Sequence, residues 1–486
     1  MNYLSKEKLA NPKLTLYAFH LKDNLAREPL TSVKNTNYLW LKCQQIGQQL
    51  NVPELENLPT KIEKINNQKT SITGEILPEG ILSFTEEENK NNLPLNLILS
   101  GEVNPLQIQD TYAIDLTLRY SNTKVNETHS TELHPDNYVK VADLKGLNKD
   151  NCLLPNNINS SLGQTLVFFA KTLEEFEDEE SLQNFADDCV KALITEEKFQ
   201  ELQIYCQSQG QLLGSPIFEY NNDADSPQQQ CHILIWLNTN PETTKHEENG
   251  EYYYPLINLL LCRNKIKYLR HKAILCNQQA RKEYSLLEKI VNEFSQIKHN
   301  IRNNLQRLQQ LLIEVPELSF DYARYIRDLQ AHKTTIEASL KNYRLQFDKI
   351  EKLYNQNDLE FLSSFSKLAQ NTYIKQINTD LAYLTPANNL FKQMTETIRG
   401  MVEIEQAKLE EENIEREKSL EDTIQVVGVA LGGGGIAAAS ISAHIDKPMI
   451  VDIKQPPHLI VSSTFWSIIA TLFLAFLTRL WIKRKI

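Results

Sequence analysis

The sequence predicts an α/β N-terminal cytosolic domain, followed by long α-helices that form a coiled coil, and then a C-terminal two-helix transmembrane hairpin. Three observations predict this fold class. Residues 1–250 alternate strand-like and helical patterns, residues 251–399 contain no glycine, and two long apolar segments lie near the C-terminus. Short mixed patterns are typical of a globular α/β domain, whereas long apolar segments are typical of membrane spans.

The expected domain boundaries follow these changes in composition. They comprise a mixed α/β domain at 1–250, long antiparallel helices at 251–385, a stalk helix at 386–423, a first transmembrane helix at 424–445, an external loop at 446–458, a second transmembrane helix at 459–482 and a basic cytosolic tail at 483–486.

Within residues 1–250, short runs of β-branched and aromatic residues predict strands, and apolar residues at helical spacing predict helices. The expected strands are residues 14–20, 93–100, 112–120, 165–170 and 232–238. The expected helices are residues 38–50 and 173–194. Asparagine-rich connectors separate these elements, which indicates loops.

Charge and cysteine usage exclude several classes of protein. The net charge of −11 argues against a surface dedicated to nucleic-acid phosphates, so we expect no direct binding of nucleic acid. The seven cysteines are scattered without a CxxC pair, which argues against a structural zinc site and against a disulfide framework. A reducing, cytosolic setting fits this pattern.

The search for catalytic chemistry is negative. The sequence contains no dinucleotide-binding glycine motif, P-loop, nucleophile elbow, metalloprotease HExxH or EF-hand pattern. Cys231 and His232 are adjacent, but neighbouring residues of a strand face opposite ways, so they do not form a nucleophile and its base. We therefore predict that the protein is not an enzyme, has no catalytic residues and has no resident cofactor, and we assign no metal site.

Residues 251–385 show apolar residues at alternating spacings of three and four, which predicts helices with one narrow apolar stripe. Pro255, Pro316 and Pro386 are expected to divide the stretch into three long helical segments. Such helices form either an antiparallel coiled coil or a bundle with a purely supporting role.

Residues 459–478 run for 20 residues without a charge, which is the length of helix that crosses a hydrocarbon core of about 30 Å. Residues 424–445 are also apolar, and Gly428 and Gly432 form a GxxxG pair there; the alternative is a flexible apolar linker. The basic tail favours two spans with both termini in the cytoplasm, by the positive-inside rule. The expected location is the inner (plasma) membrane.

The stalk carries a run of acidic residues. Such a run is typical of a solvated helical face. Repeated around a symmetric oligomer, it would instead concentrate cations at a pore entrance. The residues expected to attract cations are Glu403, Glu410, Glu417, Glu421 and Asp422.

A cytosolic α/β domain, a stalk helix that becomes the first span, a short outer loop, a second span and the basic tail TRLWIKRKI together resemble the CorA-like divalent-cation channel superfamily. The resemblance covers residues 255–486 by layout. The Gly-Met-Asn motif that ends the first span of transporting members is absent, and SISAHIDKP stands there. In this respect the chain is similar to the divergent CorA-like proteins associated with type III CRISPR systems, which are membrane effectors gated by a nucleotide signal.

The resemblance implies a homo-oligomer, with five subunits in the family, in contact with membrane lipid and either conducting a divalent cation such as Mg²⁺ or acting as a ligand-gated membrane effector. The alternative is a membrane-anchored coiled-coil scaffold that presents a cytosolic interaction domain and conducts no ions. If the first span lines a pore, glycine carbonyls and polar side chains would contact the ion. The candidate pore-lining residues are Gln425, Gly428, Gly432, Gly435, Ser440 and Ser442.

Overall fold

The computed structural model describes residues 8–22, 37–66, 74–85, 98–121, 138–173 and 176–412, together with Ile424 and Gly428. The chain divides into two compact units. The first unit comprises Met1–Leu275 and Asp328–Thr379, and the second comprises Cys276–Arg327 and Asp380–Ile486.

The described strands of the first unit form one ten-stranded mixed sheet, whose main path runs in the order β2-β4-β5-β1-β7-β10-β9-β8, with β3 paired to β4 and β6 paired to β1. The β7–β10 pair is parallel, whereas the other pairs are antiparallel. The strands are β1 (Lys8–Leu21), β2 (Gly74–Glu75), β3 (Leu82–Thr85), β4 (Ile98–Ile108), β5 (Thr111–Ser121), β6 (Tyr138–Lys140), β7 (Gly163–Thr172), β8 (Tyr205–Leu212), β9 (Ser215–Asn221) and β10 (His232–Asn238).

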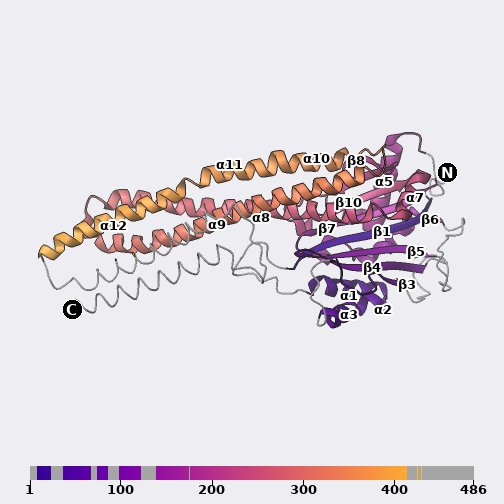
Figure 1. Ribbon diagram of the computed structural model, residues 1–486, viewed down its shortest axis with the longest axis horizontal. Coiled ribbons are helices and arrows are strands. Elements are labelled where there is room, and N and C mark those ends of the chain that lie inside the picture. Colours follow the sequence, from indigo (N-terminus) through magenta and orange to yellow (C-terminus); the bar gives the residue numbers. More distant parts are fainter. Residues whose placement is uncertain are drawn as a thin grey trace, which may run out of the picture. The chain divides into compact units, whose positions relative to one another are not determined.

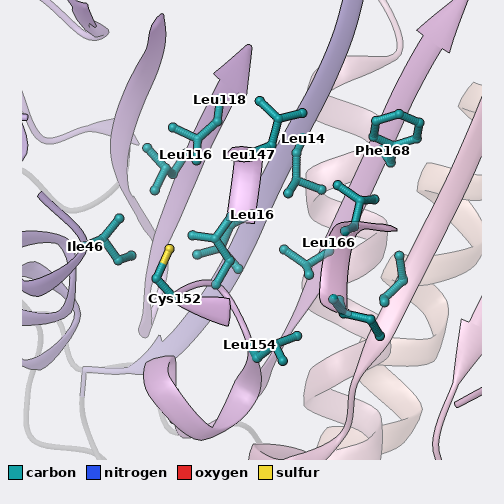
Figure 2. Close-up of a cluster of buried hydrophobic side chains, with 14 of the residues drawn as sticks. Leu14, Leu16, Ile46, Leu116, Leu118, Leu147, Cys152, Leu154, Leu166 and Phe168 are labelled. Carbon is teal, nitrogen blue, oxygen red and sulfur yellow. The ribbon is translucent and has the colours of Figure 1, made fainter. Parts of the chain in front are cut away.

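One face of the sheet carries the hydrophobic core of the first unit. Leu14 and Leu16 of β1 are in register with Leu116 and Leu118 of β5 and with Leu166 and Phe168 of β7, and all of these side chains are buried. Figure 2 shows them gathered with Ile46, Leu147, Cys152 and Leu154. Because side chains alternate between the two faces of a strand, every second residue joins this core.

Short helices cover this core face, and Figure 1 shows α1, α2 and α3 beside strands β3, β4 and β5. The helical elements that precede β10 are α1 (Tyr38–Leu50), α2 (Pro53–Glu56), α3 (Leu58–Asn66), the 3₁₀ segment η2 (Val141–Asn151), α4 (Pro155–Ile158), α5 (Glu179–Ile194), α6 (Glu196–Glu201) and η3 (Pro227–Gln229). Asp178 caps α5 by accepting a hydrogen bond from the Ser181 N–H, which satisfies a donor of the first turn.

The opposite face of the sheet is covered by the start of a long helix. Trp236 of β10 contacts Phe169 and Tyr252, with ring centroids 4.8 Å and 5.4 Å apart, and its indole N–H donates to the Leu212 carbonyl. Lys265 pairs with Asp110 at 2.7 Å. The Lys265–Asp110 pair anchors α8 (Tyr253–Ile297) on the sheet, and Tyr252 directly precedes this helix.

The remaining helices carry the chain through both units. They are α7 (Pro241–Asn249), α8 (Tyr253–Ile297), α9 (Ile301–Glu351), α10 (Glu360–Leu368), the π-helical segment η4 (Ala369–Ile374), α11 (Lys375–Leu384) and α12 (Ala387–Glu412). Helix boundaries therefore lie at two of the three prolines, since α8 begins beside Pro255 and Pro386 directly precedes α12. The predicted division at Pro316 is wrong, because α9 runs through it. Pro255 lies in the first turn of α8, where a missing N–H costs no intrahelical hydrogen bond.

The second unit shows the expected apolar stripes on its helices. Leu287 and Ile290 of α8 are buried, as are Leu308, Leu312 and Val315 of α9. Arg307 joins these helices through ion pairs to Glu293 at 2.6 Å and, within α9, to Glu314 at 2.7 Å. Tyr322 donates a hydrogen bond to the Leu384 carbonyl and packs against Phe391.

The structure corrects the predicted fold class at its C-terminal end. The first unit has the expected α/β organisation and long helices follow it. However, none of the helices in the described parts of the chain is long and apolar enough to cross a membrane. The predicted two-helix transmembrane hairpin, the membrane and channel functions that depend on it and the inner-membrane location are therefore not supported. The predicted spans at 424–445 and 459–482 lie outside the described residues, except for Ile424 and Gly428, which are helical.

A buried carboxyl group lies where α8 begins. Tyr253 donates a hydrogen bond of 2.5 Å to Asp115 of β5. Burial raises the pKa of Asp115 to about 6, although the hydrogen bonds from Tyr253 and Thr117 act in the opposite direction. The folded protein therefore holds this proton more tightly than the unfolded chain does. The resulting stabilisation is fully present below about pH 4 and is lost as the pH rises through about 6.

Replacing Asp115 with Asn should remove this dependence on pH. The free energy of unfolding of the variant should rise relative to that of the wild type as the pH increases from low values to above about 6. The rise should be up to roughly 3 kcal/mol, since a tenfold change in proton affinity corresponds to about 1.36 kcal/mol. Urea denaturation at about pH 4.5 and pH 8 measures the difference. The exposed Asp348, changed to Asn, is the control. A pH-independent difference between wild type and D115N would contradict the assignment.

Candidate ligand-binding cavity

A cavity of about 790 Å³ lies in the first unit, between the end of the sheet and the helices that cover it. Its walls come from β8, β9 and the loop after β9, from α8, and from α10 with the π-helical segment η4. This volume is typical of small-molecule sites. The lining residues that matter to its chemistry are Tyr205, Ser208, Glu219, Asn221, Asp223, Arg263, Lys267, Arg270, His271, Phe365 and Tyr373.

Four basic side chains of α8 line this cavity: Arg263, Lys267, Arg270 and His271. Their spacing of four, three and one residues places them on one face of the helix. This face is turned toward the cavity, because all four residues belong to its wall. The helix thus gives one wall a concentration of positive charge.

The innermost of these residues, Arg263, forms a buried ion pair with Glu219 of β9. The distance from Nη2 to Glu219 Oε1 is 2.7 Å, and the two side chains are 3% and 8% exposed. The guanidinium also lies over the ring of Phe365, 5.3 Å from its centroid. The other terminal nitrogen, Nη1, is buried without a hydrogen-bond partner among the described residues. A buried donor of this kind favours a ligand that can accept a hydrogen bond.

Glu219 is held by further hydrogen bonds. Its Oε2 accepts one from the Ser208 hydroxyl at 2.6 Å, and its Oε1 lies 3.1 Å from His232 Nε2. His232 Nδ1 in turn lies 2.8 Å from the Thr165 hydroxyl. Strand alternation places these polar residues of β7, β8, β9 and β10 on the face of the sheet that α8 covers, while Cys231 lies in the core on the other face.

The protonation states in this network follow from burial and charge. Burial and the neighbouring Arg263 lower the pKa of His232 to about 3, so that the ring is neutral. Burial alone would raise the pKa of Glu219, but the Arg263 guanidinium and the hydrogen bonds from His232 and Ser208 lower it well below its usual value. Glu219 is therefore ionised, and its negative charge is balanced by Arg263.

Lys267 lies one turn further along α8. No ion pair joins its amine to a carboxylate of the described residues. Glu219 pairs with Arg263, and Asp223 accepts a hydrogen bond from the Tyr205 hydroxyl at 2.9 Å. Burial and the positive charge of Arg263 lower the pKa of Lys267 well below its usual value, although Glu219 and Asp223 act in the opposite direction. A half-buried amine without an acidic partner favours a ligand that brings negative charge.

The outer part of the cavity combines a cation with an aromatic ring. The Arg270 guanidinium lies 5.4 Å from the centroid of the Tyr373 ring. Tyr373 belongs to the π-helical segment η4, a rare conformation that often marks functional sites. Across from α8, the rim carries carboxylates at Asp223, Asp225, Asp358 and Glu360. The cavity thus offers positive charge on one wall and acceptors on the other.

A second cavity of about 800 Å³ lies on the core face of the same sheet end. It is lined by Phe176, Leu182, Phe218 and polar groups that include Asp178 and Glu179. Its described wall contains no lysine, arginine or histidine. The positive wall therefore distinguishes the cavity beside α8 from the other large cavity.

Those sequence-predicted site residues that the structure describes do not line this cavity. Glu403 is exposed on α12, Glu410 belongs to the same helix, and Gly428 is helical. The structure does not bring them together. The other candidates lie outside the described residues: Glu417, Glu421, Asp422, Gln425, Gly432, Gly435, Ser440 and Ser442.

The ion pair between Arg263 and Glu219 should behave as one unit in stability measurements. Glu219→Gln leaves Arg263 buried without its counter-charge and should destabilise the first unit by about 3 kcal/mol. Adding Arg263→Met should recover part of this loss, so that the effects of the two single changes do not add. Urea denaturation of the two single variants and the double variant measures the coupling. Strictly additive effects would show that the pair does not hold α8 to the sheet.

Comparison of the chain with protein-family models, with curated proteins and with solved structures finds no match. Membership of the CorA-like superfamily therefore stays a prediction. What the cavity does is argued below from its geometry and charge.

Proposed function

We propose that the first unit is a ligand-binding domain whose cavity takes a small anionic molecule. The observation that carries the proposal is the half-buried amine of Lys267, which lines the cavity and has no ion-pair partner among the described residues. An anion bound there would supply the missing counter-charge. It would also accept a hydrogen bond from Arg263 Nη1.

On the wall formed by α8 the charges favour an anion rather than a cation, whereas Asp223, Asp225, Asp358 and Glu360 place carboxylates on the rim. Glu219 is neutralised by Arg263 and points its remaining oxygen at Ser208, so it offers little attraction to a metal ion. Arg270 adds a permanent positive charge on the same face of α8. Because charges act strongly in a partly buried site, two or three cations on one wall favour a phosphate or carboxylate group there.

The proposal replaces the predicted cation-channel function and the predicted membrane-anchored scaffold, since both require membrane spans that the structure does not support. From the predicted ligand-gated effector, it keeps only the binding of a ligand. The homo-oligomeric state stays a prediction.

Inorganic pyrophosphate is a suitable probe, and its affinity can be measured by isothermal titration calorimetry. Lys267→Met and Arg270→Met should each weaken binding about tenfold or more, because a hydrogen bond to a charged group contributes about 1.5–3 kcal/mol. Binding should also weaken as salt is added. Neither variant should lower the melting temperature, since neither residue pairs with a buried carboxylate.

Lys272→Met is the matched control for this measurement. Lys272 lies on the same helix, with its amine 5.6 Å from the centroid of the Tyr268 ring, and it is not part of the cavity wall. The control should bind pyrophosphate as the wild type does. If the wild type does not bind pyrophosphate, or if K267M and R270M bind it with wild-type affinity, the cavity is not an anion site.

A further inference from the structure

Lys267 has the surroundings of a reactive amine rather than those of a simple surface charge. It is half-buried, it lines a cavity wide enough for a small molecule, and no ion pair joins it to a described carboxylate. The guanidinium of Arg263, one helical turn before it, disfavours a second positive charge. Lysines become nucleophilic in such surroundings, because the neutral amine carries the free electron pair.

From this geometry we propose that Lys267 is a site of covalent carbonyl capture: its amine forms an imine with a small aldehyde or ketone that also carries a phosphate or carboxylate group. The inference rests on the proposed anion site and deepens it by naming the ligand's second functional group. Arg270 and His271 would hold the anionic group, and Lys267 Nζ would meet the carbonyl carbon.

The spacing along α8 fits such a ligand. Arg270 and His271 follow Lys267 by three and four residues, which corresponds to about 4.5–6 Å along the helix axis on the same face. An anionic group a few bonds from the carbonyl spans this distance. The Tyr373 ring, which contacts Arg270, closes the outer wall against the body of the ligand.

The chemical step needs no other reactant. The electron pair of the neutral amine attacks the carbonyl carbon, and the π electrons of the C=O bond move to the oxygen. The two protons that leave nitrogen go to that oxygen, which departs as water as the C=N bond forms. The balance is one amine and one carbonyl giving one imine and one water, with no oxidation or reduction.

Two buried polar atoms in the cavity wall are consistent with binding of such a ligand. Asn221 Oδ1 is buried without a hydrogen-bond partner among the described residues, as is Arg263 Nη1. Both residues line the cavity. Together they offer one donor and one acceptor in the wall of the cavity, which suits a ligand with polar groups beside its carbonyl.

Pyridoxal 5′-phosphate is the probe for this inference, because it carries an aldehyde and a phosphate. The full chain is incubated with a stoichiometric amount, the imine is reduced with borohydride, and the labelled lysines are identified by peptide mass spectrometry. Lys267 should carry about tenfold or more label than Lys272, since each tenfold fall in proton affinity gives ten times more neutral amine. Excess inorganic pyrophosphate should suppress the label at Lys267 and not at Lys272.

Two variants keep the result interpretable. Lys267→Arg places a permanent cation in the wall and removes the nucleophile, so it should still bind pyrophosphate while the reduced adduct disappears from this position. Arg270→Met retains the amine and weakens the phosphate contact, so it should lower the label at Lys267. Melting curves of both variants show whether the first unit is folded.

The outcomes separate this inference from the proposed function. Pyrophosphate binding that depends on Lys267, together with label spread evenly over the lysines, would overturn carbonyl capture and leave the anion site standing. Selective label at Lys267 that excess pyrophosphate does not suppress would overturn the anion site and the assignment of an anionic ligand. Absence of both binding and selective label would overturn both.

Discussion

The buried ion pair between Arg263 and Glu219 is the interaction on which the functional part of the structure depends. It joins the long helix α8 to strand β9 at 2.7 Å in a place where both charges are almost fully removed from water. Removing water from two charges is costly, and the pair is stable only because other groups satisfy Glu219. His232, Ser208 and, behind His232, Thr165 provide those contacts from three further strands.

This network also determines the chemistry of the cavity. Arg263 takes the charge of Glu219, and no ion pair to Lys267, one turn along the helix, is present among the described residues. The amine is half-buried, and burial together with the Arg263 guanidinium lowers its pKa well below the usual value. The same constraint therefore holds the helix to the sheet and leaves this amine available to the proposed anionic ligand. Arg263 and Glu219 thus both hold α8 to β9 and line the cavity.

The sequence predicts the regular elements better than the site. The expected helix at 38–50 and strand at 232–238 coincide with α1 and β10, because their apolar residues follow clear periodicities. Strand β8, with the sequence YCQSQGQL, escapes prediction because an edge strand with one exposed side lacks an apolar pattern. Arg263, Lys267 and Arg270 recur at the spacing of three and four at which a packed helix normally has apolar residues. This basic stripe is the sequence feature that could have indicated the cavity. The network behind them joins four strands, which no local pattern reveals.

The most direct test of this account is a crystal structure of the full chain with inorganic pyrophosphate. The account predicts a pyrophosphate in the cavity beside α8, with its oxygens within hydrogen-bond distance of Lys267 Nζ and Arg263 Nη1 and with the Arg263–Glu219 pair intact. A pyrophosphate bound only elsewhere on the protein, or an empty cavity at a concentration that saturates binding in solution, would contradict it.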